Sequence, residues 1–174
     1  MFENNFEVNF GLFLNSTKNL ISMRKTIQTG KPSVEEYDNI NKGESEVKGI
    51  EVGLKKQFIP AVFGFVNYSY QNSEDKRTGE ELEYVPENKF NLGVDLKLNE
   101  YARINAAAYY VGKRPYSEGT LDNYMVINTK LIGKINENFD LSLTIYNLFD
   151  ENYQETIHYP MPGREWQIGL SYKF

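Results

Sequence analysis

The sequence predicts an all-β protein, folded as an antiparallel meander of about eight strands. Two observations support this prediction. Apolar and polar residues alternate with a period of two along most of the chain, which gives each strand one apolar and one polar face. Aromatic residues make up 14% of the 174 residues, with 13 Tyr and 11 Phe against a single Trp, and aromatic residues favour strands. Apolar residues at helical spacing are hard to find.

The expected strands follow one another along the chain, and most are marked by an apolar row. Apolar rows run over residues 6–12 and 50–54. Residues 61–70 alternate less regularly, which an extra residue in a β-bulge would explain. Later rows occupy 90–98, 125–135 and 139–145, and the last consists of Trp166, Ile168, Leu170, Tyr172 and Phe174. Strands are therefore expected near residues 6–23, 36–57, 62–73, 89–98, 102–114, 124–135, 139–152 and 164–174.

The connections between these strands alternate in length. Short turns are expected at Ile59-Pro60, Asn99-Glu100 and 136–138, and longer polar loops near 24–35, 74–88, 115–123 and 153–163. Short turns at one end of a meander and long loops at the other are typical of outer-membrane β-barrels, where the short turns face the periplasm. The C-terminus is then expected on the periplasmic side as well.

Alternation alone does not show whether the apolar face points to a protein interior or to lipid. Three features favour lipid. The first two expected strands are long for a compact soluble barrel. On the last strand, Trp166 stands ~8 residues from Phe174, which at ~3.3 Å per residue and a tilt of ~45° matches the roughly 25 Å apolar band between two aromatic girdles. The polar face carries groups that suit a water-filled lumen, namely Asp95, Lys97, Arg103, Asn105, Lys130 and Asp140.

Composition and motifs exclude several functional classes. A net charge of −5, from 19 basic and 24 acidic residues, argues against a dedicated nucleic-acid binder. The chain has no Cys and one His, which excludes a disulfide scaffold and a thiolate metal site. No catalytic motif is present, so the protein is predicted not to be an enzyme, and no catalytic, cofactor-binding or metal-binding residue is assigned. The first residues lack the regions of a secretory signal.

Motifs along the chain resemble one family of membrane receptors. Residues 147–153 (NLFDENY), 159–164 (YPMPGR) and 172–174 (YKF) resemble the end of a TonB-dependent outer-membrane receptor. Residues 37–40 (YDNI) and 49–52 (GIEV) resemble a barrel segment of that family, and residues 13–15 (FLN) with 19–21 (NLI) resemble the strand before it. These elements occur in the family's order and span nearly the whole chain.

The resemblance implies a transmembrane barrel of about 22 strands. The chain, over residues 1–174, would be its C-terminal segment of siderophore or cobalamin type, present as an open curved sheet without the plug domain and the earlier strands. The implied location is the outer membrane of a Gram-negative bacterium. The implied function is TonB-dependent active uptake of a scarce ligand such as a ferric siderophore, haem or cobalamin. Expected partners are lipid, the barrel assembly machinery, TonB through the missing plug region, and the small-molecule ligand.

Particular residues are expected at the membrane interfaces and at the loops. Trp166, Tyr172 and Phe174 are expected to form aromatic girdles, and the terminal aromatic resembles the signal that the assembly machinery reads. The candidates for ligand contact are Tyr84, Tyr116, Tyr124, His158 and Tyr159. Two other functions stay open from the sequence: a self-contained eight-stranded outer-membrane barrel acting as an anchor or adhesin, and a soluble ligand-binding β-barrel.

Overall fold

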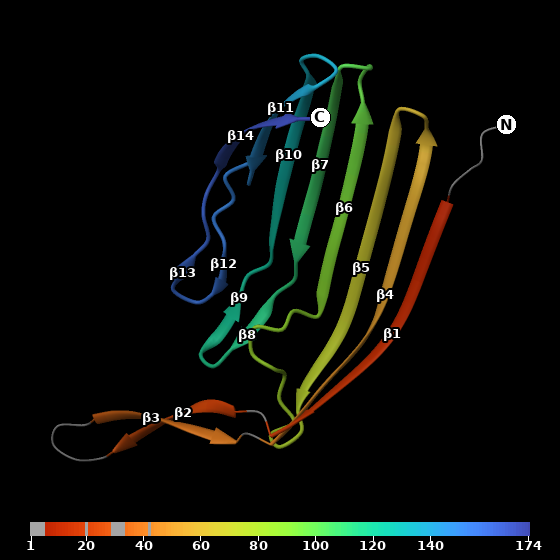
Figure 1. Ribbon diagram of the computed structural model, residues 1–174. Coiled ribbons are helices and arrows are strands. Elements are labelled where there is room, and N and C mark those ends of the chain that lie inside the picture. The colour runs from red at the N-terminus through yellow and green to blue at the C-terminus, as the bar shows by residue number, and fades with distance from the viewer. Residues whose placement is uncertain (1–5, 20, 29–33, 42) are drawn as a thin grey trace.

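The computed structural model describes residues 6–19, 21–28, 34–41 and 43–174, and its main element is an eight-stranded antiparallel sheet (Figure 1). In spatial order the sheet consists of β1 (Phe6–Lys18), β4 (Glu44–Ile59), β5 (Val62–Asp75), β6 (Asn88–Lys97), β7 (Ala102–Val111), β10 (Tyr124–Lys134), β11 (Phe139–Tyr146) and β14 (Glu165–Tyr172). Three hairpins pair β2 (Ile21–Gln28) with β3 (Val34–Asn41), β8 (Arg114–Tyr116) with β9 (Gly119–Leu121), and β12 (Gln154–Thr156) with β13 (Tyr159–Pro160). Within the described ranges, no helix is long and apolar enough to cross a membrane.

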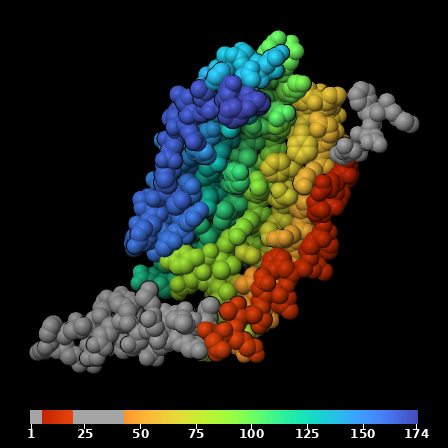
Figure 2. All heavy atoms as spheres, viewed as in Figure 1, coloured from red at the N-terminus to blue at the C-terminus, as the bar shows by residue number. Residues whose placement is uncertain are grey.

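The sheet is open. Among the described residues, β1 pairs only with β4 and β14 pairs only with β11, so the sheet has two free edges. Figure 2 shows the red surface of β1 along one side of the molecule and the blue surface of the C-terminal strands along the other. The prediction of an all-β antiparallel meander that does not close is therefore confirmed, and a closed eight-stranded barrel is not what this chain forms.

The three short turns lie where the sequence predicts them. Pro60-Ala61 joins β4 to β5, and the other two turns are closed by asparagine side chains. The Asn99 Oδ1 atom accepts the N–H of Tyr101 at 2.8 Å, and the Asn136 Oδ1 atom accepts that of Asn138 at 2.9 Å. All three turns lie at the end of the sheet near the C-terminus (Figure 1).

The pairing register confirms the predicted polar face. Asp95 lies opposite Asn105, Asn105 opposite Lys130, and Lys97 opposite Arg103. The Asn105 amide donates to the Asp95 carboxylate, and the Arg103 Nε atom lies 3.2 Å from Asp95 Oδ1. Asp95, Asn105 and Arg103 thus form a polar cluster across neighbouring strands, as cross-strand pairs on one face do.

Nothing in the described part of the chain packs against the opposite, apolar face. On the edge strands, Leu12 is 72% exposed and Ile168 is 75% exposed, and Trp166 is 61% exposed. No large side chain in the described residues is fully buried, and their buried apolar residues are only Ala108, Leu121, Tyr124 and Val126, so the sheet has little hydrophobic core of its own. An apolar surface of this extent requires another apolar environment, since leaving it in water is unfavourable.

Several predicted strand ends are wrong. The strands expected at 6–23 and 36–57 are interrupted: β1 ends at Lys18, and Asn19 adopts φ 60°. The loop expected at 24–35 is instead mostly the β2–β3 hairpin, whose tip at 29–33 lies outside the described residues. The strand expected at 139–152 ends at Tyr146, because Asn147 has φ 48°, and extended strands do not continue through that conformation. The strand expected at 102–114 ends at Val111, and the loops expected at 115–123 and 153–163 contain the β8–β9 and β12–β13 hairpins.

The irregular alternation at 61–70 has a different cause from the bulge expected there. β5 pairs with β6 without a break, and the register shift lies on β4, between Gln57 and Ile59. Phe65 points to the polar face and lies directly opposite Gly93, whose missing side chain leaves room for the ring. Phe13 and Gly49 form a second pair of this kind between β1 and β4. Such aromatic–glycine pairs fix register but break the apolar–polar pattern.

The close packing around Gly49 generates a stability prediction. In Gly49→Ala, the new methyl group would fall within contact distance of the Tyr70 carbonyl oxygen and 2.7 Å from the Phe13 ring. We expect the free energy of unfolding to fall by about 1–3 kcal/mol. The fall is measured as a lower urea midpoint for the whole gene product in its assembled state. Gly11→Ala is the control, since its methyl group would have nothing nearer than 3.8 Å. Equal midpoints for the two variants would contradict the prediction.

The terminal residue generates a second prediction. The Phe174 ring contacts Tyr172 edge to face at 5.1 Å and is otherwise fully exposed, so its deletion removes little packing. If the assembly machinery recognises Phe174, its deletion lowers the amount of assembled protein in cells several-fold. The melting temperature of the molecules that do assemble stays nearly unchanged. Deletion mutants that assemble at the normal level but melt at a lower temperature would show that Phe174 is only a girdle residue.

Candidate functional site

Three described connections meet at the end of the sheet opposite the short turns. They are residues 76–87, residues 112–123 with the β8–β9 hairpin, and residues 147–164 with the β12–β13 hairpin; we call this region the loop end (Figure 1). The β2–β3 hairpin extends from the same end. Four of the five residues expected to contact a ligand belong to the loop end, and the fifth, Tyr124, is the first residue of β10 directly after it.

Arg114 occupies the centre of the loop end. It is only 3% exposed, and its Nη2 atom donates to the Asp122 carbonyl at 3.2 Å and to the Gln154 carbonyl at 3.0 Å. Its guanidinium group lies over the Tyr124 ring, 5.0 Å from the centroid, in cation–π geometry. The sequence analysis did not single out this residue, because both carbonyl acceptors are backbone groups and the second lies 40 positions away.

Two tyrosines continue this cluster. The Tyr124 and Tyr153 rings lie 4.2 Å apart, and the Tyr124 hydroxyl donates to Glu155 Oε1 at 3.2 Å. Partial burial raises the pKa of Tyr153, and the Glu155 carboxylate raises it further, so the Tyr153 hydroxyl remains protonated at neutral pH. Tyr124 is itself 7% exposed, so it offers little surface to a ligand and supports its neighbours instead.

Asn147 organises the turn that follows β11. This side chain is 3% exposed, and its amide group donates to the carbonyls of Glu151 at 2.9 Å and Pro162 at 3.3 Å. Its Oδ1 atom accepts the Glu151 N–H at 2.8 Å, and its own N–H donates to Asn128 Oδ1 at 2.8 Å. The amide therefore uses both its donor and acceptor ends, and asparagine tolerates the left-handed conformation that the turn requires.

Asp150 closes the same segment from the other side. Its Oδ1 atom accepts the Arg164 N–H at 2.7 Å, which ties the turn after β11 to the start of β14. A Cβ atom at Gly163 would lie 2.6 Å from this oxygen, so the approach depends on glycine. The motifs at 147–153 and 159–164 thus form one hydrogen-bonded unit, and Pro162 and Gly163 shape it rather than project from it.

The 76–87 connection joins the β8–β9 hairpin through Tyr84. The Tyr84 N–H donates to the Pro115 carbonyl at 2.8 Å, and the Tyr84 and Tyr116 rings stack with centroids 6.5 Å apart. Beside this stack lies a groove of about 640 Å³ between the start of β4, the 76–87 connection and the hairpin. Its charged lining residues are Glu44, Asp75, Arg77, Glu80, Glu81 and Glu83.

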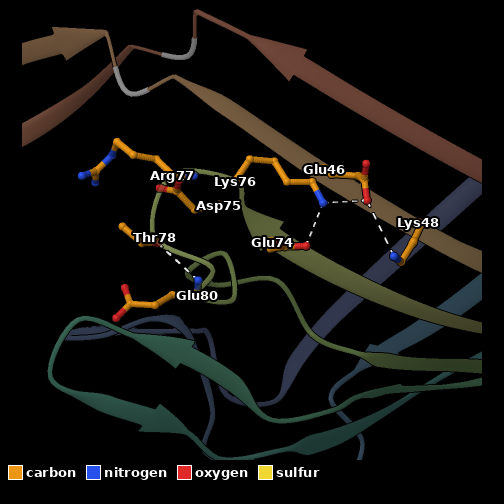
Figure 3. A network of polar contacts seen from close by, with 8 residues as sticks. All are labelled: Glu46, Lys48, Glu74, Asp75, Lys76, Arg77, Thr78 and Glu80. Atoms are coloured by element: carbon orange, nitrogen blue, oxygen red, sulfur yellow. Dashed lines mark hydrogen bonds and ion pairs between the residues drawn. The ribbon is translucent and has the colours of Figure 1, made fainter.

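A lysine network holds the base of this connection. Figure 3 shows Lys76 between Glu46 and Glu74, with Nζ–Oε distances of 3.1 and 2.8 Å, and Lys48 3.7 Å from Glu46 Oε1. Hydrogen bonds from the ammonium group to Glu74 and Glu46 raise the pKa of Lys76. Because these groups are partly exposed, the network positions the chain more than it stabilises it.

A second hollow lies on the polar face of the sheet. It has a volume of about 590 Å³ and crosses β1, β4, β5, β6 and β7. The register aligns Asn9, Gly53, Asn67 and Asn91 in one transverse row within it. A hollow on this face agrees with its assignment as the concave, wet side of a barrel wall.

The remaining candidate residues lie at the tip of the β12–β13 hairpin. Tyr159 is 71% exposed, and His158 is also exposed, with φ 68° and its N–H donated to Gln154 Oε1 at 2.9 Å. The described residues contain no group of three or more acidic or histidine side chains placed to hold a metal ion. The structure thus brings Tyr84 together with Tyr116, whereas His158 and Tyr159 lie exposed on a different hairpin.

The buried amide of Asn147 generates a prediction. Asn147→Ala removes the three hydrogen bonds of the side-chain amide and leaves buried partners unpaired, and it places alanine at φ 48°. We expect a loss of about 2–4 kcal/mol in unfolding free energy, measured by urea titration in detergent. Asn152→Ala, five residues further along at an exposed position and without a side-chain hydrogen bond to the described residues, is the control and should change stability little. A small effect at both positions would contradict this account.

Comparison with known proteins gives consistent matches. The catecholate siderophore receptor Fiu of Escherichia coli K12 is 28% identical over 130 residues, which cover 67% of this chain and 17% of Fiu. The vitamin B12 transporter BtuB of Vibrio cholerae is 25% identical over 147 residues, which cover 79% of this chain and 23% of BtuB. The chain therefore corresponds to less than a quarter of the length of either relative.

A solved structure supports the same fold. A point mutant of the ferric enterobactin receptor PfeA from Pseudomonas aeruginosa, in complex with enterobactin, superposes with a TM-score of 0.76 at 20% identity, over 96% of this chain and 29% of PfeA. The family model described as TonB dependent receptor-like, beta-barrel, matches residues 1–148. The chain belongs to the TonB-dependent receptor-like β-barrel family.

Proposed function

We propose that the chain is the C-terminal wall segment of an outer-membrane receptor for TonB-dependent uptake. The observation that supports this most directly is the open sheet with an uncovered apolar face, in a chain of this family. Free sheet edges are not viable in hydrocarbon, so the edges of β1 and β14 require further strands to complete a barrel. The apolar face then meets lipid, and the polar face lines the lumen.

The proposed cargo is a small metal chelate or cobalamin. Relatives named as receptors for a catecholate siderophore and for vitamin B12 match 67% and 79% of this chain, which favours this class of ligand over a macromolecule. On this proposal the ligand approaches the loop end, where Tyr84 and Tyr116 form a stacked aromatic surface and His158 and Tyr159 stand exposed. The chain itself catalyses no reaction.

The other partners follow from the same proposal. Trp166 and Tyr172 lie near the two ends of β14 and Phe174 lies two residues beyond it, where the girdles of a membrane barrel would be. TonB would act through a plug region outside this chain, and the barrel assembly machinery would bind the last strand. An anchor or adhesin built on eight closed strands has less support, because the sheet has free edges.

Uptake by whole cells tests the proposal. The gene is expressed in a host lacking its own siderophore and cobalamin receptors, and uptake of labelled ferric catecholate, ferric hydroxamate, haem and cobalamin is measured with and without TonB. We expect uptake of one of these ligands, and only when TonB is present. Failure to take up any of them, or uptake that persists without TonB, would overturn the proposal.

Aromatic variants test which end of the barrel binds the ligand. Tyr84→Ala with Tyr116→Ala should weaken ligand binding about ten-fold or more, as loss of buried aromatic anchors does. Tyr101→Ala is the matched control, since Tyr101 is 58% exposed but lies at the short-turn end. Equal affinity in the two variants would contradict a binding role for the stacked tyrosines.

A further inference from the structure

Arg114 joins two hairpins that are separate in the sequence. We propose that Arg114 is a positioning residue that clamps the β8–β9 hairpin to the β12–β13 hairpin, so that these two loops open and close as one unit. The proposal does not depend on which ligand the protein binds.

The hydrogen bonds of a single nitrogen atom carry the first part of the argument. Nη2 of Arg114 donates to the carbonyl of Asp122, just after β9, and to that of Gln154, the first residue of β12. The two distances are 3.2 and 3.0 Å, both within the normal range. Any motion that separates the hairpins therefore breaks at least one bond to the same charged group.

The Tyr124 ring provides a second link beside the first. Its face receives the Arg114 guanidinium, its other neighbours are the Tyr153 ring and Glu155, and it is the first residue of β10. Both hairpins are thereby anchored to the same strand of the sheet. The planar guanidinium suits this position, because it can stack on a ring while its N–H groups point sideways to carbonyls.

The hairpins have little stability apart from these links. β8 and β9 contain three residues each, and β12 and β13 contain three and two. Isolated two-stranded hairpins are marginal in water even when they are longer. The order of both loops therefore depends on contacts at their base, where Arg114 and Tyr124 lie.

The guanidinium group is costly to bury in this way. Within the described residues it has no carboxylate partner, and its Nε atom is buried without any hydrogen-bond partner. A buried guanidinium that loses part of its hydrogen bonds is unfavourable. Exposure of the group to water is therefore favoured over an intermediate in which it stays buried with fewer bonds. On this proposal the arrangement has two states: closed with both carbonyls bound, or open with a hydrated guanidinium.

Hydrogen exchange tests the clamp. Amide hydrogen exchange is measured for residues 115–121 and 154–160 in the whole gene product, in detergent micelles. In Arg114→Ala, both segments should exchange about ten-fold faster or more, because hydrogen bonds to a charged donor are lost from each. Lys113→Ala is the matched control: this neighbouring cation has a 66% exposed side chain and should leave both segments unchanged. Faster exchange in 115–121 alone would overturn the proposal.

Two further variants separate a clamp from general stabilisation. Arg114→Lys keeps the charge but has no planar guanidinium that can bond two carbonyls and stack on the Tyr124 ring at the same time. Compared with Arg114→Ala, we expect lysine to restore protection from exchange in at most one segment. Tyr124→Phe keeps the ring and should retain most of the protection in both. Full rescue by lysine, or a uniform rise of exchange across β4–β7 with a lower melting temperature in Arg114→Ala, would show that the residue only stabilises the barrel as a whole.

Discussion

The structure depends on one constraint: the apolar face of the sheet has no protein to pack against. Stability must then come from backbone ladders and from pairs on the polar face, and the register of every strand decides which residues meet lipid. A slip of one residue would turn a whole apolar row toward the lumen. The asparagine-closed turns and the aromatic–glycine pairs each fix the register at one point, and they lie at different levels along the sheet.

The same constraint explains how the loop end is built. A core cannot hold loops above a barrel wall, so buried polar groups do so instead. Asn147 satisfies both ends of its amide with main-chain groups of the turn, and Arg114 does much the same with carbonyls of two hairpins. These contacts lie at the base of the loops, next to the ends of β10 and β11, which leaves the tips free to vary.

The sequence predicts the framework better than the site. Strand faces and short turns were predicted correctly, because alternation and asparagine turn chemistry are local properties. The broken first strands were missed, since nothing in the pattern marks the left-handed conformation of Asn19. The irregular row at 61–70 was read as a bulge because Phe65 faces the polar side, and only its partner Gly93, on the next strand, explains that orientation. The role of Arg114 depends on the carbonyls of Asp122 and Gln154, and a pattern of alternating residues does not predict that these groups lie close together.

On the proposed function, selectivity for the ligand lies in the loops rather than in the sheet. Receptors named for a catecholate siderophore and for vitamin B12 match 67% and 79% of this chain, so proteins with different named ligands are similar to it over much of its length. The proposal therefore places selectivity in the connections of the loop end, 76–87, 112–123 and 147–164. A clamp at the base reconciles these demands, because it lets the tips change composition while the two hairpins keep their positions relative to each other. The clamp then orders the loops before any ligand binds. A ligand that binds such preorganised loops loses less affinity to the conformational entropy of ordering them.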